Sequence, residues 1–179
     1  GINIIIKEMN LLCMIFPIHK LKIIYKSLSL NQLVGLKMIK DVVFTPLNII
    51  EAPNGRVFHA LKNLDAGYNK FGEAYFSEVE PGMIKAWKRH RLMTLNIVVP
   101  IGEIRFVLFD DRLEGKQEYE EYSLSPQHYH RLTIPPMVWV GFQGISKSKS
   151  LLLNIADLTH DPEEVDRKEL NEIEFDWRK

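Results

Sequence analysis

The chain has 179 residues, of which 23 are basic and 23 are acidic. A chain of this length forms about one domain with a real hydrophobic core. Because the charges cancel, no overall field would attract DNA, RNA or an anionic membrane, so we expect no nucleic-acid partner. The single cysteine, Cys13, excludes an internal disulfide framework and a cysteine metal cluster, which is typical of a reducing cytoplasm.

Residues 1–40 differ from the rest of the chain, because they are rich in isoleucine, leucine and lysine and poor in acids. Lys7, Glu8 and Pro17 interrupt the apolar runs, so we expect neither a signal peptide nor a membrane span. We interpret this segment as an N-terminal extension that packs on the main domain or across a subunit interface. Attachment to a membrane surface is the alternative. The main domain is expected over residues 41–179.

From residue 41 onward, short apolar stretches alternate with proline and glycine turns, a pattern typical of antiparallel strands. The expected strands are 41–50, with an interruption at Pro46, and then 57–61, 73–79, 83–87, 95–99, 103–109, 119–124, 131–134, 138–142 and 151–155. So many short strands close most naturally as a double-sheet jelly roll. The sequence therefore predicts an all-β domain.

The strand expected at 103–109 has apolar side chains on both faces. One face holds Ile104, Phe106 and Leu108, while the other holds two apolar residues and Arg105. This pattern indicates a strand that is covered on both sides, with Arg105 directed into polar surroundings.

The only helix expected after residue 41 is short and lies near the C-terminus, over residues 161–170. Asp161 is a suitable N-cap, Pro162 would take the first helical position, and acidic residues fill the first turn. Beyond it, Phe175 and Trp177 supply an apolar anchor for the end of the chain.

Residues 82–88 read Gly-Met-Ile-Lys-Ala-Trp-Lys. They resemble the Gly-x-x-(Arg/Lys)-Gly-(Leu/Trp)-His segment of the dTDP-4-dehydrorhamnose 3,5-epimerase family. Residues 102–112 and 134–142 resemble two further stretches of that family, and the likeness extends over residues 42–177. It implies a double-stranded β-helix, the cupin-type jelly roll, that binds a nucleotide-linked 4-keto-6-deoxy sugar. It also implies a cytoplasmic homodimer in surface-polysaccharide biosynthesis that needs no cofactor and no metal.

The chain departs from the family pattern at the catalytic positions. Lys88 stands where the catalytic histidine of the family would be, and His90 matches the second histidine of a branch with a Gly-Trp-His-x-His pattern. Val140 replaces another motif histidine, and Leu158 and Thr159 occupy the neighbourhood of the catalytic tyrosine. The chain is therefore identified as a divergent member that lacks the usual catalytic histidine and tyrosine.

Epimerisation beside a ketone needs a base, donors that stabilise the enolate oxygen, and an acid that returns the proton. On a strand, Lys88 and His90 point the same way, so they are the candidate catalytic residues. Crowding with Lys85 and other cations favours a neutral amine or imidazole in either residue. Alternatively, the same cations, together with Arg105, hold a diphosphate.

Glu73 and Tyr75 share one face of their strand and match positions where the family contacts its ligand. The alternative is a salt-bridged acid and a packed aromatic. Arg105 binds substrate or pairs with an acid inside the barrel. Trp139 stacks on the nucleotide base or belongs to the core.

These residues support two main hypotheses, with a metal site as the third. The first is a 3,5-epimerase or 3,4-ketoisomerase, and the second is a non-catalytic nucleotide-sugar binder that kept the pocket. His128 and His130 form a His-x-His pair to which His90 and Glu73 could add metal ligands, as in metal-binding cupins.

Overall fold

The computed structural model describes residues 39–113 and 117–178. These residues belong to one compact unit that begins at Ile39. The extension expected over residues 1–40 thus lies almost wholly outside the described residues, and its role stays a prediction. Within the described part, no helix has the length and apolar content needed to cross a membrane.

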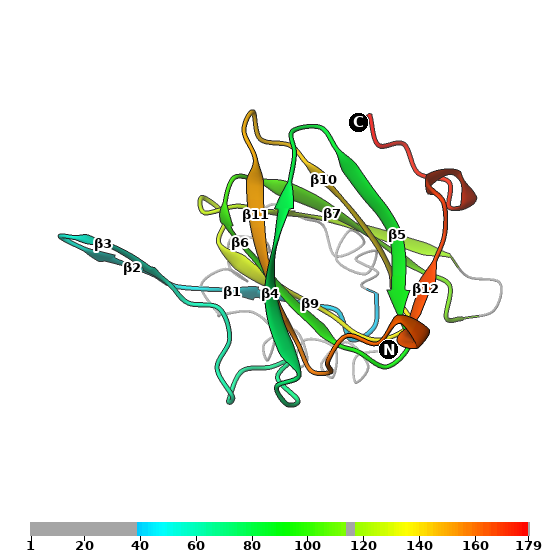
Figure 1. The fold of residues 1–179 in the computed structure, drawn as a ribbon, viewed down its shortest axis with the longest axis horizontal. Helices are drawn as coiled ribbons and strands as arrows, with labels where there is room; N and C mark the ends of the chain where they lie inside the picture. Colours follow the sequence, from blue (N-terminus) through cyan, green and yellow to red (C-terminus); the bar gives the residue numbers. More distant parts are fainter. Residues whose placement is uncertain (1–38, 114–116, 179) are drawn as a thin grey trace, which may run out of the picture. The chain divides into compact units, whose positions relative to one another are not determined.

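Two five-stranded antiparallel sheets make up the domain (Figure 1). The first sheet contains, in order, β1 (Val43–Pro46), β9 (His130–Ile134), β6 (Leu95–Ile101), β11 (Ser150–Ala156) and β4 (Glu73–Val79). The second contains β12 (Val165–Arg167), β5 (Ile84–His90), β10 (Trp139–Gly144), β7 (Ile104–Asp110) and β8 (Glu118–Leu124). The all-β jelly roll expected from the sequence is confirmed.

A separate two-stranded hairpin, β2 (Ile49–Ala52) and β3 (Gly55–Phe58), extends away from the two sheets (Figure 1). Its apolar side chains Ile50 and Val57 are 50% and 53% exposed. The segment expected as a strand over 41–50 forms two strands. β1 ends at Pro46 and β2 begins at Ile49, because proline has no N–H group to continue the hydrogen bonds of a ladder.

Strand β7 has two covered faces, as its sequence indicates. Ile104, Phe106 and Leu108 lie in the main core between the sheets. Val107 and Phe109 lie in a second apolar cluster on the outer face, with C-terminal residues Ile173, Phe175 and Trp177. The C-terminal segment therefore covers the outside of the second sheet, which explains why β7 is apolar on both sides.

The turn between β6 and β7 depends on glycine. Gly102 has φ +77°, and a Cβ at this position would lie 2.3 Å from Oγ of Ser150. Only glycine adopts this conformation without strain and leaves room for the neighbouring strand. The turn thus fixes which side chains of β7 point into the core.

The prediction of a helix over residues 161–170 is wrong beyond the first turn. The side chain of Asp161 caps the 3₁₀ turn η1 (Pro162–Glu164), as its sequence indicates. The chain then forms β12 along the open edge of β5, followed by a second 3₁₀ turn, η2 (Leu170–Glu172). Local capping signals predicted the start of the helix, but pairing with the unpaired backbone groups of β5 ends it.

Candidate active site

A cavity of about 520 Å³ opens between the two sheets, within the range of small-molecule sites. Its apolar lining comes from Leu95, Ile97 and Leu152 of the first sheet and from Val140 and Phe142 of β10. The polar lining comes from three places: β5, the facing strands β4 and β11, and the segment that begins with Arg167. A concave site with an apolar wall and a few convergent polar groups is typical of ligand binding.

Strand β5 directs Lys88 and His90 into this cavity. Their neighbour Arg89 points to the opposite face, where its guanidinium carbon lies 4.4 Å from the ring centroid of Trp139. This is the alternation expected of a strand. The two candidate catalytic residues therefore share one lumen.

His90 is held by Glu164, which lies in η1. The imidazole Nδ1 is 2.7 Å from Oε2 of Glu164, and the two side chains are only 5% and 7% exposed. The other carboxylate oxygen of Glu164 accepts hydrogen bonds from the backbone N–H groups of Leu92 and Met93, at 2.6 and 2.8 Å. Because an ionised carboxylate only accepts, we assign the proton to Nδ1 of His90, which leaves a lone pair on Nε2.

The protonation states of this pair follow from burial and hydrogen bonding. Burial lowers the pKa of His90 below its usual 6.5, and the hydrogen bond to Glu164 only partly offsets this. Burial raises the pKa of Glu164, but the hydrogen bonds from Leu92, His90 and Met93 outweigh it, so the pKa lies below the usual 4.5. At neutral pH the pair is a neutral imidazole oriented by a carboxylate, the arrangement of a general base.

Lys88 is half-buried, and its pKa is also lowered. Burial is the largest cause, and the nearby positive charge of Arg167 lowers the pKa further, while Glu164 and Glu73 oppose the change. A lysine of this kind holds its proton less tightly than an exposed one. It can stabilise a negative oxygen when charged and accept a proton when neutral.

The wall opposite β5 carries Tyr75 of β4 and Asn154 of β11. Asn154 donates a hydrogen bond of 3.2 Å from Nδ2 to the hydroxyl oxygen of Tyr75. Asn154 is 1% exposed, and its Oδ1 has no hydrogen-bonding partner among the described residues. The Tyr75 hydroxyl thus accepts from Asn154, so its own proton is available to a ligand.

Lys85 lies at the cavity beside Ser77 and Phe142. Its ammonium donates to Oγ of Ser77 at 3.3 Å and to the backbone oxygen of Glu78 at 2.8 Å. With Lys88 and Arg167, it gives the cavity a concentration of positive charge, which suits an anionic ligand.

Three of the residues predicted to bind substrate do not line the cavity. Arg105 is on the outer face of the second sheet, where it donates to Oε1 of Gln143 at 2.8 Å and to the backbone oxygen of Trp177 at 2.6 Å. Trp139 is 2% exposed on the same face and donates to Asp111. Glu73 does not line the cavity, although its charge acts on Lys88. The strand pattern of β7 left open which face meets the cavity.

Sequence reasoning missed Glu164, Asn154 and Arg167. The acids at 163 and 164 suit the first turn of a helix, and no local sequence pattern indicates that Glu164 pairs with His90. Asn154 carried a signal, because it is the polar residue in the otherwise apolar strand 151–155. Leu158 and Thr159, at the position implied for the family tyrosine, do not line the cavity.

The residues of the metal alternative are not brought together. Nδ1 of His130 lies 3.1 Å from the backbone oxygen of His128, and its ring stacks on Phe44 at 4.3 Å between centroids. Over residues 39–113 and 117–178, no three histidine, cysteine, aspartate or glutamate side chains form a cluster suited to a metal ion.

The chain is similar to proteins of known structure. No family model matches the chain. The crystal structure of a dTDP sugar isomerase from Desulfovibrio desulfuricans G20 is 36% identical and superimposes with a TM-score of 0.73. The match covers 78% of this chain and 92% of the isomerase. The chain belongs to the family of dTDP-sugar epimerases and isomerases.

Three further proteins are similar to this chain. The Probable low-salt glycan biosynthesis epimerase Agl13 of Haloferax volcanii is 29% identical over 100 residues, which is 54% of this chain and 64% of that protein. The spore coat polysaccharide biosynthesis protein SpsL of Bacillus subtilis is 26% identical over 113 residues, 60% of this chain and 75% of its own length. NovW, a 4-keto-6-deoxy sugar epimerase of Streptomyces spheroides, shares the fold with a TM-score of 0.69 at 16% identity, over 80% of this chain and 77% of NovW.

Proposed function

We propose that this protein is an epimerase or ketoisomerase of a nucleotide-linked 4-keto-6-deoxy sugar, with a dTDP-4-keto-6-deoxyhexose as the substrate. The observation that carries the proposal is the buried His90–Glu164 pair at a cavity lined by cations. An imidazole with Nδ1 bound to a carboxylate has Nε2 ready to accept a proton. Both reactions begin with the removal of a proton from the carbon next to the carbonyl.

In the proposed mechanism, Nε2 of His90 removes this proton, and the carboxylate of Glu164 stabilises the imidazolium that results. The electron pair of the C–H bond moves to the carbonyl oxygen, which becomes an enolate. The ammonium of Lys88, on the same face of β5, stabilises this oxygen by a charge-assisted hydrogen bond. Lys88 itself is the second candidate for the base, because its pKa is lowered.

Tyr75 is the proposed acid for inversion. It lies on the first sheet, whereas His90 lies on the second, so the two groups reach a bound sugar from opposite sides. Inversion requires the proton to return on the face opposite the one from which it left. A ketoisomerase needs no acid on the opposite wall. The proton of the neighbouring hydroxyl moves to the enolate oxygen, and His90 returns its proton to the former carbonyl carbon, which leaves the ketone on the carbon that was deprotonated. The identity of the product therefore decides between the two reactions.

The diphosphate of the substrate is assigned to Lys85, Lys88 and Arg167. Together, these cations offset the charge of a diphosphate that no overall net charge would attract. Phe142 provides an apolar surface nearby. Glu73, Arg105 and Trp139 are left out of this assignment, since they do not line the cavity.

The test is isotope exchange in deuterated water with dTDP-4-keto-6-deoxyglucose, followed by NMR of the sugar carbons. We expect deuterium at the carbon next to the carbonyl with the wild type, and a loss of roughly 10²- to 10⁴-fold in His90→Gln, the usual contribution of a general base. His128→Gln, which removes an exposed histidine far from the cavity, is the matched control. Saturable binding without exchange would instead identify a non-catalytic nucleotide-sugar binder.

We further propose a homodimer that works in the cytoplasm in polysaccharide biosynthesis. The relatives named for glycan and polysaccharide biosynthesis support this setting, and the single cysteine suits a reducing compartment. The partner is a second copy of this chain, packed on the outer face of β11 and β4. There Leu151, Leu153 and Ile155 alternate with the inward residues, and neighbouring Phe76 is 62% exposed.

An apolar face of this kind can pair with itself about a two-fold axis. Light scattering at micromolar concentration is expected to give the mass of a dimer, and Phe76→Glu is expected to give a monomer. A wild-type monomer would refute this part of the proposal.

A further inference from the structure

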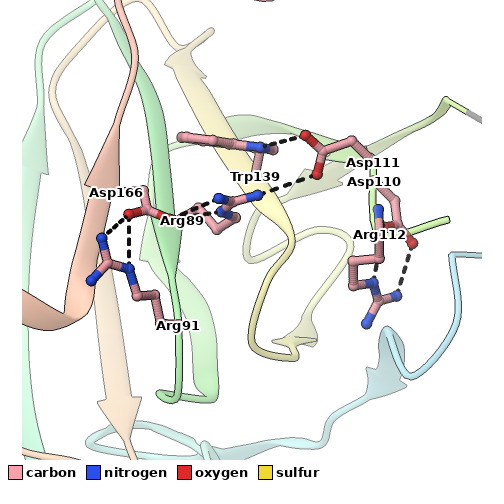
Figure 2. A network of polar contacts seen from close by, with 7 residues as sticks. All are labelled: Arg89, Arg91, Asp110, Asp111, Arg112, Trp139 and Asp166. Atoms are coloured by element: carbon pink, nitrogen blue, oxygen red, sulfur yellow. Dashed lines mark hydrogen bonds and ion pairs between the residues drawn. The ribbon is translucent and has the colours of Figure 1, made fainter. Parts of the chain in front are cut away.

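On the outer face of β5, Arg89 and Arg91 both form ion pairs with Asp166 of the neighbouring strand β12. Arg89 donates from Nε and a terminal nitrogen to Oδ2 of Asp166, at 3.0 and 2.8 Å (Figure 2). Arg91 donates in the same way to the other oxygen, Oδ1, at 2.9 and 2.5 Å. Each carboxylate oxygen therefore accepts two charge-assisted hydrogen bonds, both from one guanidinium.

The network extends across the second sheet. Arg89 also donates to Oδ1 of Asp111 at 3.3 Å, and Trp139 donates from its indole nitrogen to Oδ2 of Asp111 at 3.2 Å (Figure 2). Arg89 thereby connects Asp166 to Asp111, the residue after β7, and Asp111 in turn binds Trp139 of β10. Strands β7 and β10 are inner strands of the second sheet.

The backbone pairing of β12 with β5 is short. The strand has three residues, which pair with β5 in the register Val165–His90, Asp166–Arg89 and Arg167–Lys88. Backbone hydrogen bonds flank it at both ends, from Arg91 to the oxygen of Glu164 at 3.0 Å and between Trp87 and Lys168 at 3.0 and 3.2 Å. Short edge segments are among the parts of a protein that open readily. Side-chain contacts therefore add to the backbone bonds that hold this strand.

On either side of Asp166 in sequence, the same segment supplies the active site. Glu164 reaches His90, and Arg167 lines the cavity and acts on Lys88. The position of both groups depends on where β12 sits against β5. The ion pairs of Asp166 hold this position from the outside of the sheet, away from any ligand.

We propose that Asp166 is a positioning residue: its double ion pair with Arg89 and Arg91 holds β12 on β5 so that Glu164 orients His90. The catalytic consequence rests on the function proposed above, whereas the effect on the imidazole does not. When Asp166 no longer holds the strand, Glu164 withdraws from Nδ1, and the ring loses the partner that keeps the proton on that nitrogen. The Nε2–H form then competes, and it cannot accept a proton at Nε2.

The test is ¹⁵N NMR of the histidine rings in the full-length chain, with the His90 signals assigned by comparison with His90→Gln. The wild type is expected to show a proton on Nδ1 and none on Nε2. In Asp166→Asn we expect a substantial Nε2–H population, and a fall in kcat of up to about 100-fold, the cost of a displacement of roughly 1 Å at a reacting group. Asp166→Glu, which keeps the carboxylate, is expected to restore part of the Nδ1–H tautomer and part of kcat.

Glu163→Gln is the matched control, because it removes one negative charge from the same segment at an exposed side chain three positions away. It is expected to keep the wild-type tautomer and turnover. Should Asp166→Asn fail to fold, Arg91→Gln is the second variant. It removes one of the two guanidinium partners of Asp166, while Arg89 stays bound to Asp166 and Asp111. We expect a smaller increase in the Nε2–H population of His90. A wild-type tautomer in a folded Asp166→Asn would overturn the proposal, and it would do so even if the chain proved to have no turnover.

Discussion

The guanidinium of Arg105 donates a hydrogen bond of 2.6 Å to the backbone oxygen of Trp177, on the face of the second sheet that points away from the cavity. The same guanidinium lies 5.7 Å from the ring centroid of Trp177 and 5.9 Å from that of Phe175. Arg105 therefore fastens the C-terminal segment onto β7.

Replacing this arginine separates stability from ligand binding. We expect Arg105→Met to lower the free energy of unfolding by about 1–3 kcal/mol, because the partners of a partly buried charged donor lose their hydrogen bonds. The affinity for thymidine diphosphate should stay within about twofold of the wild type, because Arg105 lies away from the cavity and a charge distant from a binding site changes the affinity little. Urea unfolding and calorimetric titration measure the two quantities. A large loss of affinity with unchanged stability would place Arg105 at the ligand.

Lys85→Met is the reverse case. Lys85 lies at the cavity, so its replacement should weaken binding of thymidine diphosphate by roughly 1.5–3 kcal/mol, the usual value of a hydrogen bond to a charged group. Stability should change little, because the side chain is exposed. An affinity equal to that of the wild type would remove Lys85 from the diphosphate site.

Glu164→Gln tests the orientation of the imidazole. The amide oxygen of glutamine can still accept from Leu92 and Met93, which directs its NH₂ group toward Nδ1 of His90. The ring must then accept at Nδ1 and carry its proton on Nε2. We expect exchange of the substrate proton to fall by up to about 10⁴-fold, as it does when a triad histidine is held in the wrong tautomer. Rates of exchange near those of the wild type would exclude Glu164 from the mechanism.

The pH dependence follows from the lowered pKa of His90. Because the base works only when neutral, kcat/KM should fall on the acid side with a pKa below 6.5. The folded state also binds fewer protons than the unfolded state in this range, so stability is present above about pH 6.5 and declines as the pH falls toward the folded pKa of His90. Kinetics and urea unfolding between about pH 4.5 and about pH 8 measure both effects. An acid limb above pH 7 would contradict the assignment.

Tyr75→Phe distinguishes proton removal from proton return. The variant keeps the aromatic ring and loses the hydroxyl, so His90 should still remove the proton and exchange it with solvent. We expect inversion of the sugar carbon to fall by roughly 10²-fold or more relative to exchange, because the acid on the opposite wall is gone. Chromatography of the product beside NMR of deuterium uptake gives this ratio. An equal loss of exchange and inversion would indicate that Tyr75 only binds the sugar.

The sequence by itself determined the all-β class, the strands of both sheets other than β12, and the shared orientation of Lys88 and His90. These features follow from local rules, because turns are set by proline and glycine, and alternate residues of a strand point to the same side. The apolar character of both faces of β7 was also readable, since each face must be covered by something.

Only the tertiary structure decided which covering lies on which face and which acid meets His90. Arg105 and Trp139 proved to lie under the C-terminal segment. Glu164, expected in a helical turn, reaches His90 because β12, the strand that follows it, pairs with β5. Both outcomes depend on contacts between residues about 70 positions apart, such as His90 with Glu164, which are separated by 74. Local propensity carries no information about such contacts, because their free energy comes from packing and pairing that exist only in the folded chain.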